Sequence, residues 1–357
     1  MSFGPDPILR LAIVSVLILT AFTLIFMGYA FFLHLRSKAV ERRTRALEAR
    51  WKDRLLDAAT GGESSAPDPD TTLPDSEEMR AGDQVLLLEL ITRYARALDG
   101  PERRNLERLA APYLSALDDF RQDPDPYRRA YALDILGELG FAQTRDQIIG
   151  GLEDDSGLVA MVAARALARH GDAEHVPLLL DRLEVFENWS APYLASLLTS
   201  FGPDAAPALR GLAMDPSKPP RFRTVALQAL RTLNDMEGVD TAAQLLASES
   251  DPEVQAELVR LVGALGGPGH LGTIRPYATA SAPHLRAAAV RAISTLTDRR
   301  TSDVEIVSRG LDDPSPWVAL QAAHGLLELG RADELAALAA SSSPRADLAA
   351  EVLEAGS

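Results

Sequence analysis

One amphipathic helical pattern recurs through most of the chain at a nearly constant interval. In its clearest instance, Asp313–Gly330, the apolar residues Val318, Ala322, Leu326 and Leu329 follow one another at spacings of four, four and three residues, which is one face of a helix. With Val318 as the register mark, the equivalent position returns every 31 to 33 residues. The seven marks are Arg128, Val159, Ser190, Phe222, Val254, Leu285 and Val318. A period of this length predicts stacked helical hairpins, an all-α solenoid of about seven or eight repeats.

Three further positions keep the register. Four residues after the mark stand Ala132, Ala163, Leu194, Ala226, Leu258, Ala289 and Ala322. Eight residues after it stand Leu136, Leu167, Leu198, Leu230, Val262, Ile293 and Leu326. Twelve residues after it stand Gly140, Gly171, Gly202, Asn234, Gly266, Thr297 and Gly330. We expect the small residues at the fifth position to face a neighbouring helix, so a larger residue there overpacks the seam.

A register helix is expected to begin at an Asp-Pro pair, where the repeat has one, and to end at the glycine, where one is present. Asp313-Pro314 is typical of a capped first turn, and Gly330 of a left-handed closing residue. A second helix is expected after each register helix. The second helices are predicted at Thr144–Glu153, His175–Glu187, Asp204–Met214, Val239–Ala247, Leu271–Ala280, Asp303–Leu311 and Glu334–Ala340, and a shortened last repeat includes Ala349, Val352 and Leu353.

These residues resemble HEAT repeats, in the short bacterial form also found in phycobilin lyases. The resemblance is carried by the Asp-Pro openings at 123–124, 251–252 and 313–314, by the small fifth position and by the closing LGELG and LLELG. It implies a binding scaffold. It also implies a structural ladder between repeats, formed by the Arg and Asp residues Arg129, Arg223, Arg286, Asp123, Asp215, Asp251 and Asp313. We expect each pair of the ladder, partly exposed, to contribute well below ~1 kcal/mol.

The N-terminal region has a different composition from the array. Residues 11–35 contain no charge, and at about 1.5 Å per residue they are long enough to cross a bilayer. Arg10 is the only basic residue before this stretch, whereas residues 36–54 contain eight Lys or Arg. The positive-inside rule therefore predicts a single-pass anchor in a bacterial inner membrane, with the N-terminus outside and the array in the cytoplasm.

The predicted domain order follows from these segments. Residues 1–35 form the N-terminal tail and transmembrane helix, 36–60 a basic juxtamembrane helix, 61–76 a flexible linker, 77–121 an atypical capping helix pair, and 122–357 the solenoid. The juxtamembrane helix either contacts anionic lipid or is a solvated helix that only enforces topology. The linker is expected to let the array stand away from the membrane. The capping helices are predicted at Gln84–Leu98 and Pro101–Arg121, divided at Asp99-Gly100-Pro101.

Composition excludes several classes of function. The chain has no cysteine, which removes thiolate metal sites, disulfides and cysteine nucleophiles. The net charge of the whole chain is −15, and most of the acidic excess lies after residue 60. An acidic array argues against nucleic acid as a partner. The same argument opposes the HEAT-like DNA glycosylases, and no histidine is followed by glutamate, unlike the di-iron ligands of deoxyhypusine hydroxylase.

One histidine pair is a conceivable metal site. His170 and His175 share a predicted hairpin turn with Asp172 and Glu174, and these residue types can ligate zinc. We favour a polar turn there, because four ligands on a short exposed loop need a supporting shell. His324 is expected to be a half-buried packing residue. The sequence therefore assigns no catalytic, cofactor-binding or metal residue, and no cofactor.

The function predicted from the sequence is non-enzymatic. A membrane-anchored cytoplasmic scaffold or regulatory subunit would bind a partner protein through the concave face, and its anchor could also contact a membrane enzyme, such as a polysaccharide glycosyltransferase, or a signalling protein. Acidic second helices, such as those with Asp181, Glu184 and Glu187, or with Asp303 and Glu305, favour a basic partner surface. No nucleic acid or small-molecule substrate is expected. The alternatives are a bilin-lyase-like enzyme or chaperone, favoured by a polar cluster beside an apolar pocket, and an array exported to the outer side of the membrane.

Overall fold

The computed structural model describes residues 20, 22, 23, 26, 27, 46, 48–56, 59 and 74–356 of the 357. Over residues 74–356 the chain folds into eighteen α-helices, α2 to α19, joined by short 3-10 turns, and no strand occurs in this region. The prediction of an all-α fold is confirmed. The chain divides into two compact units: unit 1 extends to Asp123 and includes Glu138–Gln143, and unit 2 contains Pro124–Gly137 and Thr144–Ser357.

Unit 2 is built from the predicted hairpins. Six of the seven register marks lie within helices, and the seventh, Ser190, is the N-cap of its helix. The register helices are α5 (Pro126–Leu139), α7 (Gly157–Arg169), α9 (Ala191–Ser200), α11 (Pro220–Thr232), α13 (Pro252–Leu265), α15 (Pro283–Leu296) and α17 (Pro316–Glu328). The second helices are α6 (Phe141–Gly151), α8 (Val176–Asp181), α10 (Ala206–Met214), α12 (Val239–Leu246), α14 (Leu271–Ile274), α16 (Thr301–Arg309) and α18 (Ala332–Ala339). The short last repeat is α19 (Ala346–Ala355).

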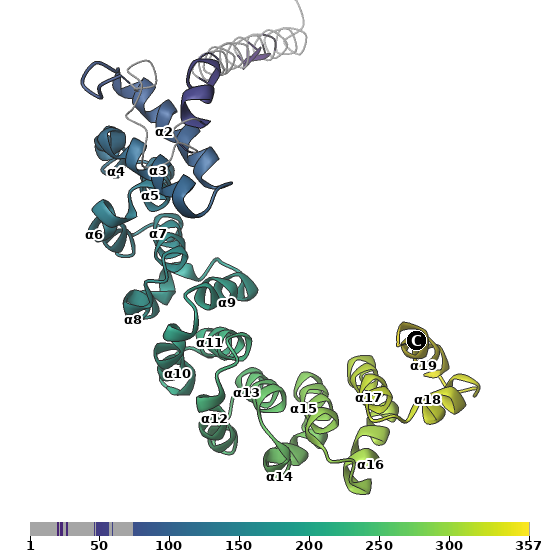
Figure 1. Cartoon of the computed structure of the whole chain (residues 1–357). Coiled ribbons are helices and arrows are strands. Elements are labelled where there is room, and N and C mark those ends of the chain that lie inside the picture. Colours follow the sequence, from purple (N-terminus) through teal and green to yellow (C-terminus); the bar gives the residue numbers. More distant parts are fainter. Residues whose placement is uncertain are drawn as a thin grey trace, which may run out of the picture. The chain divides into compact units, whose positions relative to one another are not determined.

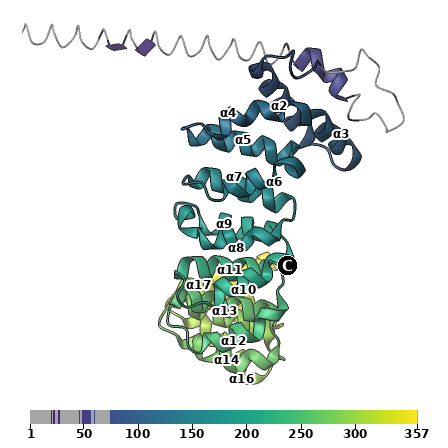
Figure 2. The same ribbon diagram turned by 90° about the vertical axis from the view of Figure 1, so that its left-hand side faces the viewer.

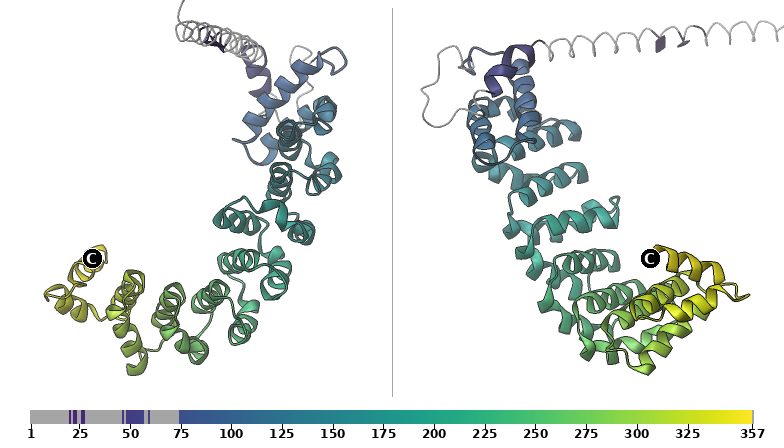
Figure 3. Two further views of the ribbon diagram at one scale, coloured as in Figure 1. Left: turned by 180° about the vertical axis from the view of Figure 1, so that it is seen from behind. Right: turned by 45° about the vertical axis from the view of Figure 1, so that its right-hand side comes forward.

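The helices of unit 2 form two layers. From α7 to α17 the register helices pack against one another in chain order and make one layer, while α8 to α16 make the other (Figure 1). Seen from the side, α7, α9 and α11 are successive, roughly parallel rungs (Figure 2). The same two layers are visible from behind in the green-to-yellow helices (Figure 3, left). We call the solvent side of the register-helix layer the register face.

The core of unit 2 lies between the layers. All residues four and eight positions after a mark are at most 2% exposed, as the amphipathic stripe predicts. The fifth-position alanines face the second helices: a Cβ added to Gly310 would lie 2.8 Å from the Cβ of Ala322, and one added to Gly151 3.0 Å from that of Ala163. The expected close approach of these alanines is therefore present.

A second crowded seam joins consecutive register helices. The residue nine positions after one mark faces the residue seven positions after the next mark. A Cβ added to Gly263 would lie 2.4 Å from the Cβ of Ala292, and one added to Gly325 would lie 2.8 Å from the Cβ of Ser294. Small residues are needed here because the helix backbones approach closely.

The predicted helix starts are correct for one repeat and misplaced for two. Asp251 is the N-cap of α13, and its carboxylate accepts from the amides of Glu253 and Val254. Helix α17 begins at Pro316, not at Pro314. The carboxylate of Asp313 accepts from the Ser315 amide at 2.8 Å, which closes a turn before the helix. In the repeat predicted to open at Asp123, helix α5 begins at Pro126.

The residues twelve positions after the mark use two different ways of ending a helix. Gly171, Gly202 and Gly330 have positive φ angles, and Asn234 has φ 57°, a conformation that asparagine tolerates better than most residues. Gly266 and Thr297 instead leave their helices in extended backbone. A left-handed residue was therefore needed at four of these positions, where the predicted closing role is confirmed.

Three of the second helices, α8, α10 and α14, are shorter than predicted, because 3-10 turns replace parts of them. The helix expected at Leu271–Ala280 consists of α14, which ends at Ile274, followed by a 3-10 turn at Arg275–Thr279 with Pro276 in its first turn. The helix expected at His175–Glu187 likewise divides into α8 and a 3-10 turn at Leu183–Phe186. Proline cannot donate an amide and interrupts the regular hydrogen-bond pattern.

Unit 1 contains the helices that do not follow the register. They are α2 (Ala81–Ala95), α3 (Gly100–Ala110) and α4 (Asp118–Arg121), with a 3-10 turn at Ala111–Leu117 between α3 and α4. The helix predicted at Pro101–Arg121 is thus broken, and Pro112 stands at the start of the turn. Glu138, only 1% exposed, accepts from Arg96 and Arg103 at 3.2 Å each. This buried cluster has no counterpart in the repeat pattern.

Part of the predicted juxtamembrane helix packs in unit 1. Trp51 and Leu55 are each 1% exposed and Ala59 is 3% exposed. The Ala59 carbonyl accepts from the side-chain amide of Asn105 at 3.1 Å, and Arg93 pairs with Glu48 at 3.2 Å. One face of this helix is thus buried in protein, while Arg50 and Lys52 are exposed, so contact of the basic side chains with anionic lipid stays a prediction.

Described residues on both sides of the predicted linker contact unit 1. Before it, Ala59 is held by α3. After it, the Tyr113 hydroxyl donates to the Pro74 carbonyl at 2.7 Å, and the Gln84 side chain donates to the carbonyls of Ser76 and Met79. Both flanks contact the same unit. The residues between these flanks, 60–73, lie outside the described part of the chain, so the flexible linker stays a prediction.

Within the described residues, no helix is long and apolar enough to span a membrane. The predicted span, residues 11–35, lies almost entirely outside the described residues, as does most of the predicted linker at 61–76.

Candidate functional site

A groove on the register face of unit 2 is the best candidate for a binding site. It has a volume of about 370 Å³ and crosses α11, α13, α15 and α17. Small residues form its floor and three arginines and a tryptophan project around it. The lining residues are Arg231, Arg260, Gly263, Ala264, Ala287, Ala288, Arg291, Ala292, Thr295, Trp317 and Gln321.

The helical register places these side chains together. Arg260 and Arg291 both stand six positions after their marks, so they occupy equivalent places on α13 and α15. Trp317 stands one position before its mark, on the same side of α17, and is 57% exposed. An exposed tryptophan beside arginines is typical of the central part of protein interfaces.

Arg231 occupies an unusual place in the repeat. It stands nine positions after its mark, where α13 has Gly263 and α15 has Ser294. Its Nε is buried and has no hydrogen-bond partner. A buried donor without an acceptor is costly, so this arginine is poised to gain from an acidic group in the groove.

The other two arginines are paired with carboxylates on the rim. Arg260 pairs with Glu257 at 2.5 Å, and Arg291 pairs with Glu328 at 2.6 Å. The second oxygen of Glu257 is buried without a partner, while the first accepts from Gln228 at 3.1 Å. Arg291 and Glu328 are each more than 40% exposed, so solvent screens their attraction and an incoming carboxylate can compete.

The Arg–Asp ladder is present, with partly different partners from those expected. Arg286 binds Asp313 through two nitrogens at 2.7 and 2.8 Å, and both residues belong to the predicted ladder. Arg129 binds Asp154 at 2.8 Å, and Arg223 binds Glu249 at 2.5 Å; neither carboxylate was among the predicted ladder residues. Each rung links a register helix to the turn before the next one.

The ladder is more buried than expected. Arg223 and Glu249 have side chains only 3% and 6% exposed. Hydrogen bonding to Arg286 holds the pKa of Asp313 below its ordinary value, and Arg129 does the same for the pKa of Asp154. Removing one partner of such a buried pair costs more than the expected fraction of a kcal/mol, because the other charge remains buried.

A second ladder, which the sequence analysis missed, runs along the other edge of the repeats. Its arginines lie in the second-helix layer and its carboxylates lie in the following repeat. The pairs are Arg145–Asp172 at 2.8 Å, Arg210–Asp235 at 2.5 Å and Arg275–Asp303 at 2.6 Å. Their separations of 25 to 28 residues match those of the first ladder, which is the signal that could have revealed them.

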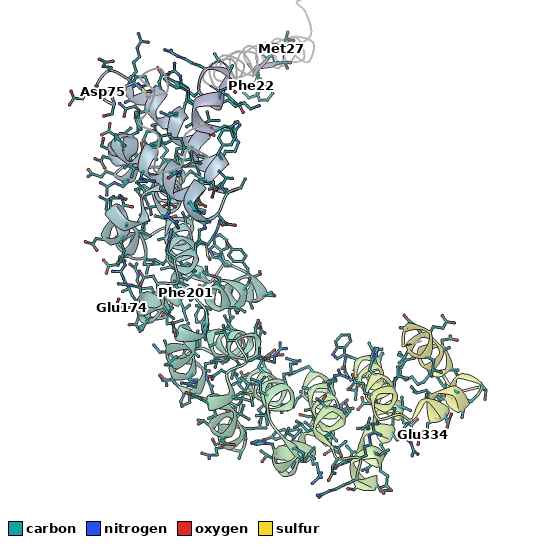
Figure 4. All side chains as sticks on the ribbon, in the orientation of Figure 1. Phe22, Met27, Asp75, Glu174, Phe201 and Glu334 are labelled. Atoms are coloured by element: carbon teal, nitrogen blue, oxygen red, sulfur yellow. The ribbon has the colours of Figure 1, made fainter. Side chains whose placement is uncertain are left out.

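The histidine-containing turn forms only part of the conceivable metal cluster. Asp172, Glu174 and His175 lie within ligand distance of one another, whereas the Nε2 of His170 contacts the Gly137 carbonyl at 2.8 Å. Arg145 binds both Asp172 and Glu174, and Glu174 projects into solvent on the second-helix side (Figure 4). The guanidinium already supplies the positive charge that these carboxylates need, which favours the polar-turn interpretation.

Comparison with known proteins supports the repeat assignment. A family model described as HEAT repeats matches residues 114–191 and 239–304. No curated protein matches the sequence. Residues 114–191 and 239–304, in the two halves of the array, therefore match HEAT repeats, and the described fold is an all-α solenoid.

Several solved structures resemble the chain at low sequence identity. The karyopherin Kap121p bound to Ste12p is 14% identical, with a TM-score of 0.47; the match covers 87% of this chain and 41% of the karyopherin. Human deoxyhypusine hydroxylase is 15% identical, with a TM-score of 0.30, and 70% and 98% of the two chains are covered. The CpcE–CpcF complex of phycocyanin lyase from Nostoc is 16% identical, with a TM-score of 0.25, and 83% and 97% are covered. The chain thus spans about two fifths of the karyopherin that it matches.

Proposed function

We propose that this protein is a non-enzymatic scaffold or regulatory subunit that binds a partner protein at the cytoplasmic face of a bacterial inner membrane. The observation that carries the proposal is the register face, where exposed aromatic and arginine side chains stand on a rigid layer of packed helices. Tyr127 is 73% exposed, Tyr193 38% and Trp317 57%. Large aromatic side chains in solvent mark interaction surfaces.

The membrane part of the proposal rests on the sequence. The uncharged stretch at residues 11–35 and the basic residues that follow it favour a span with the array inside the cell. Trp51 and Leu55 are buried in unit 1, and only ten residues separate the end of the proposed span from Ala46. Unit 1 would then be held close to the bilayer, and a partner bound to the same chain would gain effective concentration there.

Topology and partner binding are tested separately. Reporter fusions after Ser357 should give an active cytosolic marker and a silent periplasmic marker; the reverse result would favour the exported array. Purification of the full chain from membranes in mild detergent should retain a stoichiometric partner protein. A chain without residues 1–35 should be found in the soluble fraction. Full membrane retention of that shortened chain would contradict the anchor.

A second candidate is a bilin-lyase-type enzyme or chaperone, favoured by one observation. The groove places three arginines and a tryptophan beside an apolar floor, the arrangement that suits a small molecule with carboxylates. Incubation of the purified full chain with a free bilin distinguishes the two. A stoichiometric change in visible absorption that Arg260→Glu abolishes would favour this candidate over the scaffold.

A further inference from the structure

We propose that the groove across α11, α13, α15 and α17 binds an extended acidic segment of the partner protein. This inference rests on the proposed scaffold function and names the chemistry of its partner. It differs from the basic partner surface expected from the sequence, because the charge of the register face differs from that of the chain as a whole.

The charge of the groove is the first argument. The chain has a net charge of −15, yet the charged residues that line the groove are Arg231, Arg260 and Arg291 alone. Their neighbours Glu257 and Glu328 pair with Arg260 and Arg291, so the groove retains a positive balance. Arg231 has a buried nitrogen without an acceptor. A carboxylate is the complementary ligand, since arginine binds it with two parallel hydrogen bonds.

The spacing of the arginines is the second argument. They stand on three consecutive register helices, and packed helices lie about 8–10 Å apart. A chain in the polyproline II conformation rises about 9 Å over three residues and returns its side chain to the same side. Carboxylates at every third position of an extended segment would therefore meet successive arginines as the segment crosses the helices.

The apolar end of the groove is the third argument. Trp317 stands on α17, beyond the last arginine, and it is largely exposed. The floor consists of small residues because the helix backbones approach closely at Gly263 and Ala292. A backbone can thus lie low in the groove, while Trp317 covers an apolar residue of the segment. Nucleic acid fits less well, because the acidic remainder of the chain repels a long polyanion.

The first experiment measures binding of a defined probe to the purified full chain. The probe is a fluorescent peptide of about a dozen residues with glutamate at every third position and one leucine after the last glutamate. We expect saturable anisotropy, weakened by salt, and at least about tenfold weaker binding to Arg231→Ala and to the double variant Arg260→Glu/Arg291→Glu. Arg309→Glu on α16 is a charge-reversal control outside the groove and should bind normally. Trp317→Ala should weaken binding of this probe, but it should not weaken binding of a second peptide in which alanine replaces the leucine.

Several results would overturn the inference. Equal binding of a peptide with lysine in place of glutamate, or of a single-stranded oligonucleotide of equal charge, would exclude an acidic peptide site. Concentration-dependent self-association lost in Arg260→Glu/Arg291→Glu would assign the groove to a second copy. If the double variant purified from membranes still retained the stoichiometric partner, the groove would not be the binding site, but the scaffold function would stand. If the unmodified chain retained no partner at all, the scaffold function itself would be refuted.

Discussion

Unit 1 and unit 2 are stabilised in different ways. In unit 2 the same contacts recur at each repeat: a buried apolar stripe, a close helix seam and an Arg–carboxylate rung such as Arg286–Asp313. In unit 1 the contacts occur once: Trp51 from a preceding segment fills the core, and Glu138 binds two arginines. Loss of one contact in unit 2 should therefore be compensated in part by equivalent contacts in neighbouring repeats, whereas unit 1 has no equivalent contact that could compensate.

The largest effect is expected at Trp51. Replacing this side chain by alanine removes a fully buried indole from unit 1 and should destabilise that unit by about 3–5 kcal/mol. Trp317→Ala is the same substitution at a 57% exposed position of unit 2 and should be nearly neutral for stability. Hydrogen exchange of the two units measures the effect. Equal protection losses in both variants would contradict the packing of Trp51 in the core of unit 1. A chain that starts at Glu77 lacks Trp51 altogether and should show the same loss, so an independent fragment should begin near Ala46.

The second test addresses the fifth-position alanines. Ala226→Leu and Ala289→Leu enlarge side chains that are fully buried, and each should destabilise unit 2 by about 1–3 kcal/mol through overpacking. Gln228 and Arg291 are poor controls, because the first bonds Glu257 and the second pairs with Glu328. Exposed Gln244 on α12 is a cleaner control, and Gln244→Leu should be nearly neutral. The exchange of amides in the adjoining repeats should accelerate first, because repeat arrays transmit damage between neighbours. Equal sensitivity at Gln244 would mean that the helical phase is wrong.

Two glycine substitutions should change the free energy of unfolding in opposite directions. Gly263→Ala places a Cβ 2.4 Å from that of Ala292 and 2.9 Å from its Cα, and should destabilise by about 1–2 kcal/mol, since the backbones must separate. Gly211→Ala adds a methyl group in α10 with nothing within 4 Å, and should stabilise by about 0.5–1 kcal/mol through helix propensity. Urea denaturation of both variants measures the difference. Stabilisation by Gly263→Ala would show that the seam is looser than described.

The sequence predicted the repeating helices, and it missed contacts that depend on how those helices pack. The register specified all seven register helices and their buried faces, because a 3.6-residue period is local information. It did not reveal that Trp51 packs in unit 1, since no period relates that residue to α2 or α3. The partners of Arg129 and Arg223 were also missed, because turn geometry between repeats decides which carboxylate is within reach. The groove could not be predicted for a similar reason. Each of its arginines is present in the sequence, but whether they lie close together depends on the stacking of three helices.

The smallest effect concerns acid stability and the ladder. Hydrogen bonding from Arg286 lowers the pKa of Asp313 below the ordinary value of 3.8, and Arg275 does the same for the pKa of Asp303. A carboxyl whose pKa is lower in the folded state contributes stability that is complete above its unfolded pKa and is lost as pH falls through the folded value. The free energy of unfolding should therefore decline below about pH 4, and Asp313→Asn should show a shallower decline together with lower stability at neutral pH. Asp333→Asn on α18 controls for the change in net charge and should retain the full acid dependence. If Asp313→Asn declined as steeply as the unmodified protein, the rung between α15 and the turn before α17 would not be the ion pair that couples these repeats.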